Sequence, residues 1–120
     1  MNGQTYRIGL DGEETARKYL EEQGMIFVRS RYRCVCGEID LVMLDGDTLV
    51  FTEVKTRSNG PEGSGLMAVD RRKQERLSRA ALIFMKEFHR KGSHARFDVV
   101  EINNRGIIHI RDAFHPGLPL

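Results

Sequence analysis

The chain has 120 residues, of which 40% are hydrophobic and 30% charged, a balance typical of one globular domain with a modest core. No apolar run approaches the roughly 18 residues that a membrane span needs, and residues 1–10 lack the apolar segment of a signal peptide. We therefore expect a single domain over residues 1–120, located in the cytoplasm and without a membrane partner. The net charge of +2 is too small to indicate a nucleic-acid partner by itself.

The first half of the chain predicts a helix followed by three strands. Residues 11–23 carry an apolar stripe at Ala16, Tyr19 and Leu20, and Gly24 is suited to end this helix, which can begin a turn earlier. Residues 25–33, 38–44 and 49–55 favour strands, and the last segment is strongly β-forming at Val50, Phe51, Thr52 and Val54. The Asp-Gly-Asp-Thr sequence at residues 45–48 has the composition of a tight hairpin turn.

The second half predicts a long helix and two more strands. Half of residues 58–65 are Gly or Pro, which indicates a loop. Asp70 is a candidate N-cap for a helix that runs to residue 90, with Gly92 placed to end it. Strands are expected over residues 96–102 and 107–111, around a turn at residues 103–106, and residues 115–120 should be irregular.

The predicted order is α-β-β-β-α-β-β, and the fold class is α/β. The helix over residues 70–90 joins the third and fourth strands, and a connection of that length permits a parallel crossover. We therefore expect a mixed sheet flanked by helices.

The hairpin of the second and third strands carries the residues of chemical interest. Glu53 and Lys55 are two apart and share one face of a strand. A two-residue turn at residues 46–47 places Asp40 opposite Glu53, with Cβ atoms about 4.5–5.5 Å apart. Two carboxylates so close repel each other, and a divalent cation that both bind removes the conflict. Oxygen ligands of this type suit Mg²⁺ or Mn²⁺.

Lys55 adds a cation that can hold a phosphate oxygen or orient a water molecule. A metal ion, two carboxylates and a lysine together supply what phosphodiester hydrolysis needs. The alternative explanation of the hairpin is a set of surface ion pairs between strands, which are common and contribute little.

The two helices add further candidates. Glu13 falls on the inward stripe of the first helix, where it can join the acids of the hairpin or simply favour the helix dipole. Lys73 lies one turn before Leu77 on the inward stripe of the second helix, where it can reach the sheet or extend its stem along the core. The other basic residues of this helix form an outer face, which can bind phosphate or be an ordinary solvated side; they are Arg72, Arg76, Arg79, Lys86 and Arg90.

These motifs resemble the YraN-type bacterial family of predicted endonucleases, which is distantly similar to archaeal Holliday-junction resolvases. The resemblance rests on three segments and on the order in which they occur: Gly9-x-x-Gly12-Glu13-x-x-Ala16-x-x-Tyr19-Leu20, Gly37-Glu38-Ile39-Asp40-Leu41-Val42 and Val50-Phe51-Thr52-Glu53-Val54-Lys55-Thr56-Arg57. Lys73 with its helix and the strand Arg96-Phe97-Asp98-Val99-Val100 continue the match.

The resemblance implies a restriction-endonuclease-like fold with an Asp…Glu-x-Lys nuclease core. The implied catalytic residues are Glu13, Asp40, Glu53 and Lys55. The implied metal ligands are Asp40 and Glu53. The candidate nucleic-acid-binding residues are Arg57, Arg72, Lys73 and Arg76. Glu38 belongs to the family motif without an assigned role.

We therefore expect a Mg²⁺- or Mn²⁺-dependent endonuclease that cuts DNA, linear or branched, and that can act as a homodimer. Two alternatives remain open: a non-catalytic nucleic-acid-binding module on the same fold, and an RNA nuclease.

Overall fold

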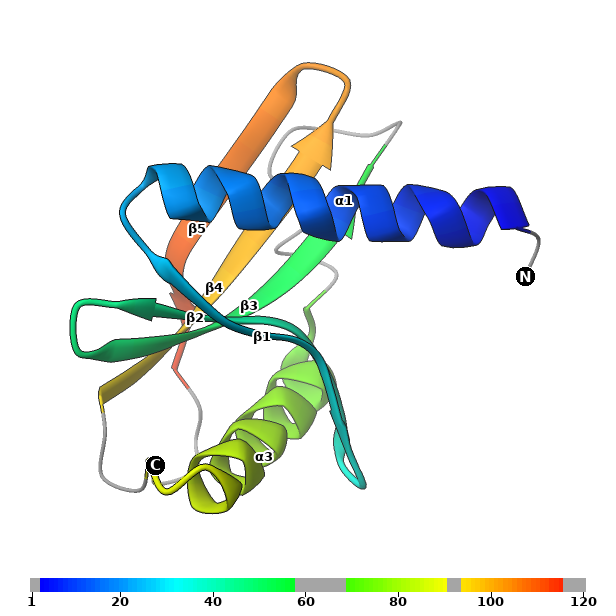
Figure 1. Ribbon diagram of the computed structural model, residues 1–120. Coiled ribbons are helices and arrows are strands. Elements are labelled where there is room, and N and C mark those ends of the chain that lie inside the picture. Colours follow the sequence, from blue (N-terminus) through cyan, green and yellow to red (C-terminus); the bar gives the residue numbers. More distant parts are fainter. Residues whose placement is uncertain (1–2, 58–68, 91–93, 116–120) are drawn as a thin grey trace.

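The computed structural model describes residues 3–57, 69–90 and 94–115, with the backbone alone described over residues 3–11. Two helices and five strands follow one another in the predicted order, so the expected α-β-β-β-α-β-β arrangement is confirmed (Figure 1). The elements are α1 Gly3–Glu22, β1 Ile26–Cys34, β2 Gly37–Asp45, β3 Thr48–Thr56, α3 Arg71–Glu87, β4 His94–Asn103 and β5 Gly106–Phe114.

The strands form one sheet in the order β1-β2-β3-β4-β5. Neighbouring strands are antiparallel except β3 and β4, which run parallel, as the crossover through α3 requires. The tight turn after Asp45 pairs that residue with Thr48, which confirms the predicted hairpin. The result is the mixed sheet that the sequence predicts.

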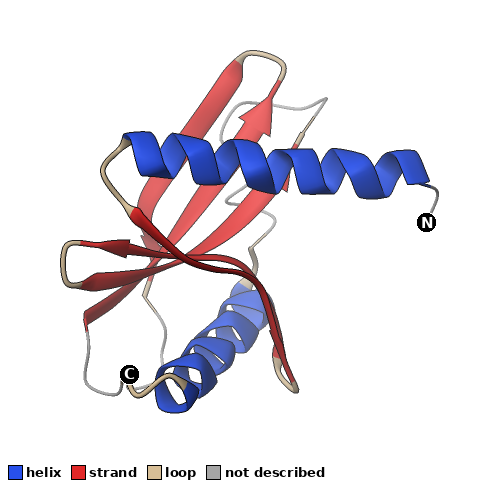
Figure 2. Ribbon diagram, in the orientation of Figure 1, coloured by secondary structure: helices blue, strands red, loops and turns tan. Residues whose placement is uncertain are grey.

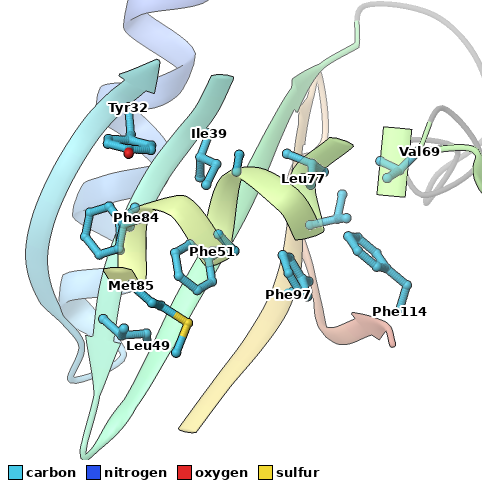
Figure 3. Packing of buried hydrophobic residues seen from close by; sticks show 14 residues of the cluster. Tyr32, Ile39, Leu49, Phe51, Val69, Leu77, Phe84, Met85, Phe97 and Phe114 are labelled. Carbon is cyan, nitrogen blue, oxygen red and sulfur yellow. The ribbon is translucent and has the colours of Figure 1, made fainter. Parts of the chain in front are cut away.

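The two helices pack against separate apolar clusters. Phe51 belongs to the cluster of α3, which also contains Leu77 and Phe84 (Figure 3). The neighbouring Val50 belongs to the cluster of α1, which contains Leu20. Because successive residues of a strand point to opposite faces, the two clusters lie on opposite faces of the sheet. Figure 2 shows α1 crossing the strands β3 to β5, while α3 lies beside the β1–β2 hairpin.

The ends of the helices differ from the prediction. The helix α1 begins at Gly3, two turns before residue 11. The side chain of Asp70 caps α3 by accepting a hydrogen bond from the backbone N–H of Lys73 at 2.9 Å, as predicted. The helix ends at Glu87 rather than at residue 90, because His89 adopts a positive φ of 56° that a helix cannot accommodate.

The two segments predicted to be irregular fall mostly outside the residues that the structure describes. The loop expected over residues 58–65 lies outside the described residues, as do residues 116–120 of the expected irregular tail. Within the described part of the chain, neither helix is long and apolar enough to cross a membrane.

A buried polar network joins β4, β5 and α1. The carboxylate of Asp98, which is fully buried, accepts hydrogen bonds from Arg96 Nε at 3.0 Å, from His109 Nε2 at 2.7 Å and from the backbone N–H of Asp112 at 3.0 Å. On the other side of the imidazole, Nδ1 lies 3.3 Å from the Tyr19 hydroxyl. Burial alone would raise the pKa of Asp98, but these donors outweigh it and lower the pKa. The network therefore holds an ionised carboxylate inside the fold.

Candidate active site

The site lies where β2 and β3 separate. Their antiparallel ladder ends at the Leu41–Thr52 pair, so the predicted next pair, Asp40 and Glu53, is not part of it. The side chain of Asp40 instead accepts a hydrogen bond from the backbone N–H of Val54 at 2.8 Å. This bond places the Asp40 carboxylate in the fork between the two strands, where groups from both faces of the sheet can reach it.

Three carboxylates from two elements converge at this fork. Ligand oxygens of Glu13, Glu38 and Asp40 all lie within 4.8 Å of one another. Glu13 comes from α1, and it reaches the fork because the preceding residue, Gly12, packs directly against the Thr56 side chain. A methyl group at Gly12 would collide with the Thr56 hydroxyl. The absence of a side chain at this position thus allows α1 to bring its acid to the strands.

Arg31 on β1 binds two of these acids. Its Nε lies 3.5 Å from Glu13 and 3.4 Å from Glu38, and Arg33 contacts the other oxygen of Glu38 at 3.2 Å. The backbone of Arg31 has a φ of 51°, a left-handed conformation that a non-glycine residue rarely adopts. Such strained residues occur frequently at functional sites. Here the strained residue is one whose side chain binds the acids.

Glu53 lies on the same pocket but is held by lysines. Its Oε1 is 2.7 Å from Lys73 Nζ and 3.2 Å from Lys55 Nζ, and its side chain is only 5% exposed. Glu53 is not one of the three carboxylates that lie within 4.8 Å of one another. The two lysines account for this, because they hold Oε1 and neutralise the buried charge.

These groups line a pocket of about 380 Å³. Four carboxylates and three cations share it, so charges of both signs face one small space. The lining residues are Glu13, Arg31, Gly37, Glu38, Asp40, Glu53, Lys73, Arg76 and Leu77. A pocket of this kind suits a ligand that combines a cation with an anion, such as a divalent metal ion and a phosphate.

The surroundings of Asp40 and Glu13 disfavour the charged forms of these two acids. Burial and then the charge of Glu53 raise the pKa of Asp40 to about 7, although the Val54 N–H opposes the shift. Burial also raises the pKa of Glu13, against the effect of Arg31. A bound divalent cation would relieve both groups, because it favours their charged forms.

At Lys73, in contrast to the two acids, the surroundings favour the charged form of the side chain. Burial would lower the pKa of this ammonium group, but its hydrogen bond with Glu53 and the charge of that acid outweigh burial and raise the pKa. The pocket therefore keeps a positive charge beside its carboxylates.

The structure brings most of the predicted site residues close together. Glu13, Asp40, Glu53 and Lys73 line one pocket, and Lys55 contacts it through Glu53. Lys73 reaches the sheet, as its place on the inward stripe of α3 predicts. Their functional roles remain predictions.

Only some of the basic residues predicted to bind nucleic acid lie at the pocket, and one of them is predicted on the outer face of α3. Arg76, assigned to the outer face of α3, is exposed but also lines the pocket. Arg72 is exposed on the first turn of α3 and does not line it. Arg57 is half-buried, and its Nε has no hydrogen-bond partner among the described residues.

Two charged residues of the pocket carry no role in the sequence prediction. Glu38 is predicted only as part of a motif, and the sequence analysis assigns nothing to Arg31. Strand alternation places Glu38 on the face of Asp40, and this was the available signal. No pattern in the sequence predicts the backbone conformation of Arg31.

Comparison with known proteins gives one family. A family model described as "Uncharacterised protein family UPF0102" matches residues 12–102. A UPF0102 protein of Halorhodospira halophila is 45% identical over 106 residues, which cover 88% of this chain and 85% of the relative. A UPF0102 protein of Desulfosudis oleivorans is 38% identical over 120 residues, which cover 98% of each chain. The matched region contains every residue of the pocket.

Proposed function

The chain belongs to the uncharacterised protein family UPF0102, and from this premise and the geometry of the pocket we propose that it is a divalent-metal-dependent endonuclease acting on DNA. The observation that carries the proposal is the convergence of Glu13, Glu38 and Asp40 beside Lys73 in one pocket. The resemblance of the motifs to predicted endonucleases of restriction-endonuclease-like fold supports it.

The proposed metal ligands are carboxylate oxygens, the donors that Mg²⁺ and Mn²⁺ prefer. Glu13, Glu38 and Asp40 offer oxygens that lie within 4.8 Å of one another. Glu53 is the further proposed ligand, and it would offer Oε2, since its Oε1 binds both lysines. When bound, the ion supplies an activated water and neutralises charge on the phosphate.

The chain's own residues then act on the phosphate. Lys55 holds a phosphate oxygen or orients the attacking water, and Glu53 fixes its ammonium group at 3.2 Å. Lys73 contacts the same Glu53 oxygen at 2.7 Å and lines the pocket, and it neutralises the charge that develops in the transition state. Glu13 completes the proposed catalytic set with Asp40, Glu53 and Lys55.

The proposed partner is nucleic acid, bound through its phosphates by Arg57, Arg72, Lys73 and Arg76. Of these, Arg76 and Lys73 line the pocket and would contact the phosphates nearest the cut. DNA, linear or branched, is preferred over RNA because of the resemblance to junction resolvases. The proposed assembly is a homodimer, since cutting two strands needs two sites, and light scattering of the purified protein measures this directly.

Calorimetry with Mn²⁺ tests the metal site. Wild type should bind one ion and Asp40→Asn should not, because the substitution removes the charge of a proposed ligand. Asp47→Asn, a change at an exposed aspartate of the hairpin turn, is the matched control and should bind as wild type does. Equal binding by wild type and Asp40→Asn would contradict the assignment.

Cleavage assays test the reaction. Wild type with Mg²⁺ should cut DNA in a comparison of branched DNA, duplex DNA and RNA. Lys55→Ala should reduce single-turnover cleavage by about 10²–10³ with little loss of affinity, because the charge acts mainly in the transition state. Lys55→Arg should not restore the rate, since guanidinium differs in shape. Tight binding by wild type without cleavage of any substrate would favour the non-catalytic binding module.

A further inference from the structure

A second pocket lies along α3, beyond the first. It has a volume of about 260 Å³ and lies between β1 and the end of α3. Its lining residues are Val28, Arg29, Phe84, Phe88 and Arg90. Both pockets are thus bounded by β1 and α3: Arg31 and Lys73 contribute to the first, and Arg29 and Phe88 to the second.

The second pocket combines aromatic faces with guanidinium groups. The Arg29 guanidinium lies 5.3 Å from the centroid of the Phe88 ring and 5.6 Å from that of Tyr32. The Phe88 ring is 4.6 Å from the Phe84 ring, with an interplanar angle of 35°. Phe88 is 37% exposed, which is unusual for so large an apolar side chain. Aromatic and guanidinium planes of this kind are the groups on which unpaired nucleobases stack.

A stripe of basic residues connects the two pockets. Arg76, Arg79 and Lys86 recur at spacings that keep them near one side of α3, and Arg90 follows shortly after the helix ends; all four are exposed. Arg76 lines the first pocket and Arg90 the second. At 1.5 Å per residue, the helical part of the stripe from Arg76 to Lys86 is roughly 15 Å long, a length that corresponds to about four stacked nucleotides.

One acid interrupts the basic stripe, and it is already bound. Glu87 lies at the end of α3, where its Oε2 accepts a hydrogen bond from the Tyr32 hydroxyl at 2.6 Å. Burial, and then this hydrogen bond and the charge of Glu87, raise the pKa of Tyr32 to about 12. The phenol therefore remains protonated and keeps donating to Glu87. Glu87 also fixes the aromatic wall, because Tyr32 packs edge-on against the Phe84 ring at 5.1 Å.

We propose that the second pocket, formed by Arg29, Phe84, Phe88 and Arg90, receives an unstacked base of a single-stranded nucleic acid whose phosphates follow the basic stripe to the acid pocket. This inference rests on the proposed function, since it defines the substrate as a strand with at least one unpaired base. Stacking on Phe88 holds the base, and Arg29 and Arg90 contact the adjoining phosphates.

The test compares two oligomers by fluorescence anisotropy, with chelator present so that no strand is cut. One is a dodecamer of thymidylate, and the other is the same sugar-phosphate chain without bases. Wild type should bind the thymidylate roughly fivefold or more tightly than the abasic chain, in line with the contribution of base stacking. Phe88→Leu keeps the apolar volume but removes the ring, and it should reduce this preference to nearly one. Val35→Ala, at a 96% exposed valine on the β1–β2 hairpin, is the control and should retain it.

Charge is tested separately. Arg90→Gln should weaken binding of both oligomers. It should also reduce the slope of the logarithm of the binding constant against the logarithm of the salt concentration, by about 0.7 for each lost phosphate contact. Lys18→Gln, at an exposed lysine of α1, should change neither quantity. An oligouridylate with the same base preference would extend the site to RNA.

Two results separate this inference from the proposed function. An equal preference for bases in wild type and Phe88→Leu overturns the base pocket, even if wild type cuts DNA with Mg²⁺. A preference that disappears in Phe88→Leu supports the pocket, and it does so even if no substrate is cut. Arg29→Gln, at an exposed position, should weaken binding of both oligomers and keep the base preference, which tests the phosphate contact independently of the folding of Phe88→Leu; an unchanged affinity in Arg29→Gln would contradict that contact.

Discussion

The backbone N–H of Val54 donates a hydrogen bond to the carboxylate of Asp40 at 2.8 Å, at the point where β2 and β3 separate. In a regular ladder this N–H would bond to a backbone carbonyl of the neighbouring strand. The side chain of Asp40 takes that place, so the strands part without leaving the donor of Val54 unpaired. An acid held in this way is both a structural element and a candidate ligand.

The first prediction is that Asp40→Asn stabilises the protein at alkaline pH. The asparagine oxygen can still accept the Val54 N–H, while the unfavourable buried charge is removed. Because burial and Glu53 raise the pKa of Asp40 to about 7, its ionisation costs stability as the pH rises from about 4, the unfolded value, to 7 and remains unfavourable above. At about pH 8 the gain should be on the order of 2 kcal/mol, allowing for partial exposure.

Thermal unfolding in chelator measures this effect. The melting temperature of Asp40→Asn should exceed that of wild type by several degrees at alkaline pH, and the difference should shrink as the pH falls toward 4. Asp47→Asn should show no such pH dependence, because that residue is exposed. A difference that stays constant with pH would show that the charge of Asp40 is not the cause.

The second prediction separates Lys73 from Arg79. Lys73 Nζ is 2.7 Å from Glu53 Oε1, whereas Arg79 is exposed on the far side of the helix. At saturating DNA, Lys73→Met should lower the cleavage rate on the order of tenfold or more, since a charge aimed at the phosphate is lost. Arg79→Met should alter affinity and its salt dependence while leaving the rate unchanged. A larger rate effect at Arg79 would rule out the assigned role of Lys73.

The third prediction concerns the close packing of α1 on β3. Alanine has a higher helix propensity than glycine by about 1 kcal/mol, so Gly12→Ala would stabilise an isolated helix. In the protein its methyl group collides with the Thr56 hydroxyl, so α1 should shift and carry Glu13 away from Glu38 and Asp40. We expect Mn²⁺ affinity to fall several-fold in calorimetry.

A double substitution provides the control. Thr56→Ala removes the group that collides, so Gly12→Ala combined with Thr56→Ala should recover most of the lost affinity. Thr56→Ala alone should bind Mn²⁺ as wild type does. Failure of the double variant to recover would mean that Gly12 acts through something other than this contact.

The fourth prediction is that Asp98→Asn is strongly destabilising. The substitution leaves Arg96 and His109 without the carboxylate that both bind, and breaking a buried pair costs about 3 kcal/mol or more. The pKa of Asp98 is lowered in the fold, so its contribution is present above the unfolded pKa of about 4 and is lost as the pH falls below it. In urea unfolding, the free energy of unfolding of Asp98→Asn should be lower than that of wild type at neutral pH, and this difference should narrow under acidic conditions. A difference independent of pH would refute the charged network.

Local chemistry made much of the fold predictable. The Gly46-Asp47 turn fixed the register of the β2–β3 hairpin, and Asp70 marked the start of α3. The faces of Glu13 and Lys73 followed from helical periodicity, which depends only on sequence spacing.

The remainder of the site depends on tertiary structure. The end of the β2–β3 ladder removes Asp40 from direct pairing with Glu53, and Lys55 and Lys73 then hold Glu53 apart from the other acids. The backbone of Arg31 has a conformation that its own sequence disfavours. These features arise from interactions between elements distant in the chain, and no local pattern encodes them.

The parallel pairing of β3 with β4 also determines when the site forms during folding. The two strands meet only after the chain closes a loop of about forty residues, which is entropically slower than forming the β1–β2, β2–β3 and β4–β5 hairpins. Glu13, Asp40 and Glu53 precede this loop closure, whereas Lys73 lies within the closing segment. Asp40 and Glu53 therefore lie on a hairpin that can form early, with Lys55 already beside Glu53, whereas Lys73 completes the pocket only when this loop closes.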